Sequence, residues 1–176
     1  PLFAASSSNV ARSDLETYED FKQRLAAHHP TLSMLSLSEM DIHGHYLRWS
    51  EYLAAIIRAD SLVDDLWTLL EADPVYSGRT ALIVTCDHGR HLDDSGGYQN
   101  HGDGCLGCQR LGFIALGPEF ARGLESPALR LQLDIATTVA HLLSFPAPFS
   151  EGDLIEEIFA SGSPVGAGLY TEAATH

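Results

Sequence analysis

The stretch Ala81-Leu82-Ile83-Val84-Thr85-Cys86-Asp87-His88-Gly89 decides the fold, because an apolar, β-branched run ends there in a carboxylate and an imidazole. A short run of this kind is typical of a buried strand, and we predict a strand over residues 80–86. In α/β proteins the chemistry gathers where parallel strands end. Asp87 and His88 are therefore candidate metal ligands.

Helical and extended patterns alternate on either side of this strand. The helix nearest the N-terminus has Ser13 as its candidate N-cap and Pro30 as its stop. The alternation predicts an α/β fold with a mostly parallel sheet and helices on both faces. The expected elements are helices over residues 14–27, 46–72 and 131–143, and strands over residues 32–40, 80–86 and 113–116.

Length and composition favour one domain, since 176 residues that are 45% hydrophobic suffice for a single core. We assign residues 1–160 to this α/β domain. Residues 161–176 are rich in small side chains, and we expect them to form a flexible tail. Residues 1–10 are small, polar and Ser-rich, which is typical of a loop or a frayed end.

The charge balance excludes some classes of partner. Ten Lys plus Arg against 24 Asp plus Glu give a net charge of -14, which argues against nucleic-acid binding and leaves no polybasic membrane patch. A small anionic substrate stays compatible, because bound divalent cations would reverse the local field. No apolar run approaches the roughly 20 residues that cross a bilayer, so we expect no membrane segment in this chain. Three cysteines, an odd number, argue against a disulfide scaffold.

Metal-type residues follow each predicted strand. Asp41 and His45 lie four residues apart just beyond the first strand, so one helical turn would bring both to the same side. Asp87 and His88 follow the second strand, and His101 lies in the loop that leads to the third. Parallel strands end at one edge of a sheet, so the five side chains could converge. Five ligands exceed one tetrahedral zinc and favour two divalent metals about 3.5 to 4 Å apart, a pair suited to displacement at phosphorus.

Each of these pairs also has a purely structural interpretation. The first could be a capped helix start and the second a hydrogen-bonded turn, and their shared position after strands is what favours a metal site. Cys105-Leu106-Gly107-Cys108 has the spacing of a redox motif or half a zinc site, yet no second Cys or His pair is obvious. For these two cysteines we favour a local disulfide or free thiols over catalysis.

Taken in order, these residues resemble the alkaline phosphatase superfamily, and within it the nucleotide pyrophosphatase/phosphodiesterase and phosphoglycerate-mutase-like branches. The resemblance covers residues 32 to about 158. It implies that Asp41, His45 and His101 hold one zinc, with Mn or Mg as alternatives, and that Asp87 with His88 belongs to a second site. The matching segments are Asp41-Ile42-His43-Gly44-His45, Ala59-Asp60, Thr85-Cys86-Asp87-His88-Gly89, His101-Gly102, Phe113-Ile114-Ala115-Leu116-Gly117-Pro118-Glu119-Phe120 and Leu133-Asp134-Ile135-Ala136-Thr137-Thr138-Val139-Ala140.

The chain departs from this superfamily in its nucleophile. Members carry, near their N-terminus, an Asp for the second metal and a Ser or Thr that attacks phosphorus or sulfur, and both should precede the region covered here. A nucleophile needs a rigid support and an activating metal or base. The substitutes considered and set aside are Ser6, Ser7 and Ser8, which lack a preceding strand, Ser36 and Ser38 within a predicted strand, and Thr85 beside the ligand pair.

The resemblance therefore implies the C-terminal portion of a two-metal hydrolase of phosphate mono- or diesters, or of related sulfate or phosphonate esters. A missing N-terminal half, or a partner chain, would supply the nucleophile and cover the open sheet edge. The chain alone would turn over little or nothing. Members of the superfamily are often exported, which would suit a periplasmic or secreted protein.

Two hypotheses compete with this one. The first is a non-catalytic metal-binding or interaction module. The second is a Cys-His enzyme that uses Cys86 or Cys105, and it predicts sensitivity to thiol reagents that chelators do not mimic.

Overall fold

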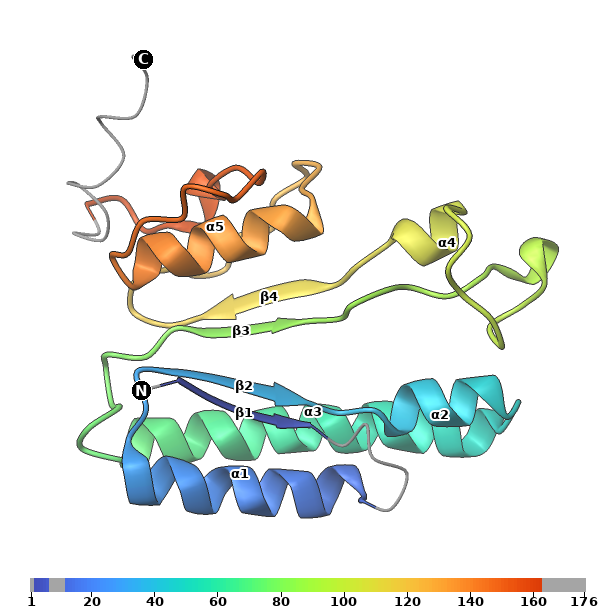
Figure 1. The fold of residues 1–176 in the computed structure, drawn as a ribbon, viewed down its shortest axis with the longest axis horizontal. Coiled ribbons are helices and arrows are strands. Elements are labelled where there is room, and N and C mark those ends of the chain that lie inside the picture. The colour runs from blue at the N-terminus through green and yellow to red at the C-terminus, as the bar shows by residue number, and fades with distance from the viewer. Residues whose placement is uncertain (1, 7–11, 163–176) are drawn as a thin grey trace. The chain divides into compact units, whose positions relative to one another are not determined.

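The computed structural model describes residues 2–6 and 12–162, which belong to two compact units (Figure 1). The first unit comprises Pro1–Ser77 and His88–Arg110. The second comprises Gly78–Asp87 and Leu111–His176.

The first unit combines a parallel pair of strands with helices. Strand β1 (Leu2–Ser6) pairs in parallel with β2 (Leu32–Ser36), and α1 (Asp14–His28) makes the crossover between them. This is the βα connection that parallel strands require. The unit continues with α2 (Glu39–His45), α3 (Trp49–Ala72), the short 3-10 helix η1 (Asp93–Ser95) and the single turn α4 (Leu106–Gln109).

Helix α1 begins and ends where its sequence predicts. The Ser13 hydroxyl accepts a hydrogen bond from the Glu16 backbone N–H at 3.2 Å, and the Glu16 carboxylate accepts one from the Ser13 N–H at 2.8 Å. This capping box satisfies two donors of the first turn. His29 ends the helix with φ 43° directly before Pro30. The buried side chains of α1 and α3 form the core of the unit: Tyr18, Phe21, Leu25, Ala55, Leu62, Leu66 and Leu70.

A buried carboxylate on α1 fixes the start of α2. Asp14 is 1% exposed, and its carboxylate accepts hydrogen bonds from the backbone N–H groups of Ser38 at 2.8 Å and Glu39 at 3.2 Å. An acceptor at this end of a helix satisfies donors that the helix leaves unpaired. The strand predicted over residues 32–40 therefore stops at Ser36, and residues 39–45 are helical.

The second unit has an antiparallel pair of strands and one helix. Strand β3 (Leu82–Thr85) pairs with β4 (Phe113–Leu116), with Leu82 opposite Leu116 and Thr85 opposite Phe113. Helix α5 (Gln132–Leu142) and the short 3-10 helix η2 (Glu156–Ile158) follow. The core comprises Phe120, Ile155 and Ile158, against which pack Ala81, Ile83, Phe113, Ala115, Leu142 and Phe159.

The α/β class is confirmed, whereas the described strands do not form a mostly parallel sheet. One pair is parallel and the other is antiparallel. The reason lies between β3 and β4, where residues 86–112 contain only η1 and the single turn α4. A parallel return requires a crossover, usually a full helix, and this segment provides none.

The sequence predicts a loop over residues 1–10 and a tail over residues 161–176, and the structure describes only part of each. The loop predicted over residues 1–10 is wrong for Leu2–Ser6, because the mostly apolar stretch Leu2-Phe3-Ala4-Ala5-Ser6 pairs with β2 as a strand. The absence of a strand before Ser6, used above to set it aside, is corrected by the same finding. Residues 7–10, and residues 163–176 of the expected tail, lie outside the described residues. No helix in the described part of the chain is both long enough and apolar enough to span a bilayer.

Candidate metal centre

Two of the predicted ligands lie on α2. Asp41 and His45 are one helical turn apart, and the Asp41 Oδ2 to His45 Nε2 distance is 3.4 Å. The helical turn expected from their spacing is therefore present. Both side chains are about two-fifths exposed, at 41% and 42%, so this face of the cluster is open to solvent.

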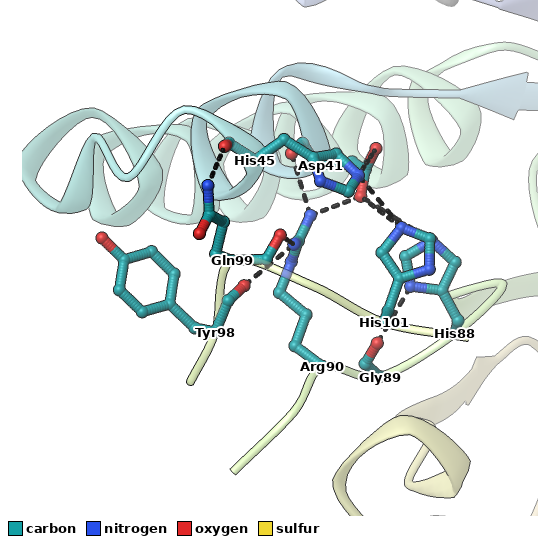
Figure 2. A network of polar contacts seen from close by, with 8 residues as sticks. All are labelled: Asp41, His45, His88, Gly89, Arg90, Tyr98, Gln99 and His101. Carbon is teal, nitrogen blue, oxygen red and sulfur yellow. Dashed lines mark hydrogen bonds and ion pairs between the residues drawn. The ribbon is translucent and has the colours of Figure 1, made fainter. Parts of the chain in front are cut away.

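His88 and His101 lie beside this pair, as Figure 2 shows. Asp41 Oδ1 is 3.5 Å from His101 Nε2 and 3.7 Å from His88 Nε2. The two imidazole rings stack with their centroids 3.5 Å apart. His45 Nε2 is 3.1 Å from His101 Nε2. One carboxylate and three imidazoles thus direct their ligand atoms toward one another, and we call these four residues the open cluster.

The orientation of His88 is fixed by its own backbone neighbourhood. Its Nδ1 lies 2.9 Å from the carbonyl oxygen of Gly89, a hydrogen bond that places the proton on Nδ1. The other nitrogen, Nε2, faces Asp41 (Figure 2). Such a partner on the far nitrogen is what fixes the tautomer of a metal-binding histidine.

The donor set fits one divalent ion. Around a tetrahedral zinc, neighbouring nitrogen and oxygen donors lie about 3.3 Å apart. Four donor pairs in the open cluster lie between 3.1 Å, for His45 to His101, and 3.7 Å, for His88 to Asp41. These four distances are within a few tenths of an ångström of the spacing around zinc, and the ligand atoms of Asp41, His88 and His101 all lie within 4.8 Å of one another.

The pKa of His101 is lowered from its usual value. Burial is the main cause, since it disfavours the charged imidazolium, and the nearby charge of His88 adds to it. A lowered pKa keeps the imidazole neutral, which is the form that binds a metal ion.

Arg90 is a member of the site that sequence reasoning missed. Its side chain is 10% exposed, and its guanidinium pairs with the Asp41 carboxylate. It also donates to the backbone carbonyls of Asp41 at 2.9 Å, Tyr98 at 2.9 Å and Gln99 at 3.2 Å (Figure 2). Arg90 therefore ties α2 to the loop that leads into His101, and it orients the carboxylate of Asp41.

Gly44 makes room for this guanidinium. A Cβ at Gly44 would lie 2.5 Å from Cζ of Arg90, which is closer than real Cβ contacts. The sequence contains two features that could have indicated this contact: an arginine two residues after His88, and a glycine between Asp41 and His45. Neither feature predicts that Gly44 and Arg90 are in contact, because they lie 46 residues apart in the sequence.

Four of the five predicted ligands are thus brought together within the first unit, and the fifth is not among them. Asp87 is the last residue of a segment of the second unit, where its carbonyl oxygen accepts a hydrogen bond from the Gln132 side chain at 3.0 Å. The resemblance assigned His88 to a second metal with Asp87, whereas its ring stacks on that of His101. The role of all five as metal ligands stays a prediction.

Comparison with known proteins identifies the family. A search of curated proteins finds no match to this sequence. The family model for type I phosphodiesterase/nucleotide pyrophosphatase matches residues 5–92, which is half of the 176-residue chain. The matched segment includes Asp41, His45, Asp87 and His88, and it ends before His101. The resemblance is confirmed, and the chain belongs to the type I phosphodiesterase/nucleotide pyrophosphatase family.

Proposed function

We propose that this chain is part of a hydrolase of small phosphate esters, mono- or diesters, that depends on divalent metal ions. The observation that carries the proposal is the convergence of Asp41, His45, His88 and His101. Three of these residues lie in the segment that matches the family. Phosphoester hydrolysis is the chemistry that the family name describes, and the donor set is of the kind that such chemistry uses.

The open cluster would hold one zinc ion through Asp41, His45 and His101, with His88 beside it, and Asp87 would contribute to a second ion. Bound zinc polarises a phosphoryl oxygen and lowers the pKa of an attacking group. Arg90 holds the Asp41 carboxylate in place, and the stacked rings of His88 and His101 limit each other's rotation. In a chain with a net charge of -14, bound cations would also attract an anionic ester.

The proposal extends to the parts of the enzyme outside this chain. Residues 1–160 would be the C-terminal portion of one α/β metallohydrolase domain whose complete sheet is mostly parallel. The nucleophile and the remaining Asp of the second site would come from an N-terminal half or a partner chain. The 176 residues alone would then bind metal weakly and hydrolyse little ester.

Metal analysis combined with hydrolysis assays tests the proposal on the longest natural form of the protein. The substrates are bis-p-nitrophenyl phosphate and p-nitrophenyl phosphate, which distinguish diesterase from monoesterase activity. Loss of a residue that only hydrogen-bonds to a metal ligand typically lowers activity roughly 10- to 100-fold. We expect a larger loss in each of the variants Asp41→Ala, His88→Ala and His101→Ala, because these residues would bind the metal directly. Asp60→Ala and His28→Ala, an exposed carboxylate on α3 and an exposed imidazole on α1, are the matched controls.

Three outcomes would contradict this function. The first is activity that survives unchanged in the Asp41 and His101 variants. The second is activity that survives exhaustive chelation. The third is a natural form that binds metal fully and hydrolyses neither ester, which would favour a non-catalytic metal-binding module.

A further inference from the structure

A second group of metal-type side chains lies in the first unit, outside the open cluster. His91, Asp103, Cys105 and Cys108 each offer one ligand atom, and these four atoms lie within 4.8 Å of one another. His91 Nε2 is 3.1 Å from Asp103 Oδ1. We call these residues the cysteine cluster. Its members come from two stretches of chain that the sequence separates by a loop of eleven residues, 92–102.

The imidazole of His91 lacks hydrogen-bond partners. Its side chain is 12% exposed, and among the described residues neither ring nitrogen has a partner with hydrogen-bond geometry. A buried polar atom without a partner destabilises the folded chain, because it has lost its hydrogen bonds to water. The ring is held in place through its backbone, whose N–H donates to the carbonyl oxygen of Asn100 at 3.1 Å. A cation between His91 and Asp103 would satisfy the nitrogen that faces the carboxylate.

The two cysteines form a turn suited to a pair of thiolates. Cys105 is the N-cap of α4, and its sulfur accepts a hydrogen bond from the Cys108 backbone N–H at 3.5 Å. Burial raises the pKa of the Cys108 thiol, so a metal ion would have to displace its proton on binding. The two thiols are free in the structure, with Cys108 buried and Cys105 half-buried.

The cysteine turn is clamped against the segment that carries His91. The Gly89 N–H donates to the carbonyl oxygen of Cys108 at 2.9 Å. A Cβ on Gly107 would lie 2.2 Å from the carbonyl oxygen of Arg90, so only glycine permits this approach. The contact is therefore built between two backbones, and it keeps both cysteines beside His91.

We propose that the cysteine cluster is a structural zinc site, distinct from the open cluster. Two thiolates, an imidazole and a carboxylate make a closed set of four, and sulfur donors favour zinc over magnesium or calcium. Neighbouring donors around zinc lie about 3.3 to 3.8 Å apart, so the side chains need to draw inward by roughly 1 Å.

The cysteine cluster lies close in sequence to two histidines of the open cluster. His91 lies three residues after His88, and Asp103 lies two residues after His101. An ion that joins His91 to Asp103 fixes the two segments that carry the stacked imidazoles of the open cluster. The zinc would thus act as a cross-link in a loop region with little regular structure.

Cobalt substitution of the purified, reduced protein tests the site directly. Wild type should show thiolate-to-cobalt charge-transfer absorption in the near ultraviolet, and its zinc content should exceed that of the double variant Cys105→Ser/Cys108→Ser by one equivalent. The double variant should lose the absorption, whereas Cys86→Ser, which alters an exposed cysteine of the second unit, should retain it. Asp41→Ala should also retain it, so loss of the open cluster and loss of this site are separable.

Thiol alkylation provides a second measurement that does not depend on the folding of a variant. In wild type, zinc should slow the modification of Cys105 and Cys108 and leave that of Cys86 unchanged. The site is overturned if reduced wild type shows no thiolate-to-cobalt absorption, or if zinc does not change the alkylation of Cys105 and Cys108. Isolation of the native protein with a Cys105–Cys108 disulfide that zinc and reductant do not replace overturns it as well.

Discussion

The open cluster and the cysteine cluster lie in the same unit and alternate along the same stretch of chain, yet they differ in chemistry and exposure. The open cluster offers only nitrogen and oxygen, and Asp41 and His45 remain about two-fifths exposed. The cysteine cluster adds two sulfurs, and its His91 and Cys108 are largely enclosed, whereas its Asp103 carboxylate is 59% exposed. A catalytic metal needs a free coordination position, whereas a structural metal is fully surrounded by protein. The difference in donor type is what favours the catalytic ion proposed for the open cluster and the structural ion proposed for the cysteine cluster.

The largest effect should come from Gly107→Ala, which tests whether the cysteine cluster depends on its backbone contact. The new Cβ would meet the Arg90 carbonyl oxygen at 2.2 Å, and neither backbone can retreat without breaking the hydrogen bond from Gly89 to Cys108. We expect a loss of about 3 kcal/mol in the free energy of unfolding, measured by urea denaturation.

Gly44→Ala is the matched comparison in the open cluster. Its Cβ would meet the guanidinium of Arg90 at 2.5 Å, which is the end of a flexible side chain and can shift. The expected loss is about 1 kcal/mol. A larger loss for Gly44→Ala than for Gly107→Ala would reverse the ranking of the two clusters in rigidity.

Arg90→Lys should have the next largest effect, and it should act on the open cluster alone. A lysine cannot reproduce the fork that contacts the carbonyls of Asp41, Tyr98 and Gln99. We expect a loss of about 2 kcal/mol in unfolding free energy, because Asp41 is partly exposed and water compensates part of the lost pair. Zinc affinity of the open cluster should fall, while the thiolate-to-cobalt absorption of the cysteine cluster persists. Loss of both together would show that the two clusters are not independent.

The smallest effect should be on the pH dependence of unfolding. It separates the acid sensitivity that comes from helices α1 and α3 from the sensitivity that comes from loss of bound metal. On α3, Asp65 accepts a hydrogen bond from the Tyr18 hydroxyl at 2.6 Å, which with Lys22 holds the pKa of this carboxyl below its usual value. Because the folded state lowers this pKa, the stabilisation is complete above the usual aspartate pKa and is lost as the pH falls through the folded value.

Asp65→Asn should therefore lower stability near neutral pH and reduce the acid dependence of unfolding below about pH 4. Unfolding of the metal-free protein in urea at a series of pH values measures this dependence. Asp64→Asn, an exposed neighbour on the same helix, is the control. An unchanged pH profile for Asp65→Asn would show that the acid response arises elsewhere, including in the histidines of the two clusters.

Local sequence signals predicted several elements closely. Ser13 and Pro30 bound α1, and the apolar run Phe113–Leu116 forms β4 over the range that was expected. These succeed because caps, proline and short apolar runs act on the residues beside them. The end of the strand predicted over residues 32–40 was wrong, because the carboxylate that binds the first N–H groups of α2 belongs to Asp14, 24 residues before Ser38. Strand β1 was missed because the serines that follow it made residues 1–10 resemble one loop, and because its partner β2 begins 30 residues further along the chain.

The sequence by itself determined the alternation of helices and strands, the family, and the residue types that could bind metal, since these depend on periodicity, spacing and side-chain chemistry. Only the tertiary structure decided that β3 and β4 run antiparallel, that Arg90 pairs with Asp41, and that His91 and Asp103 lie close to Cys105 and Cys108. The physical reason is that each of these contacts joins residues from separate segments. Whether such residues meet depends on the path of the chain between them, which no local pattern specifies.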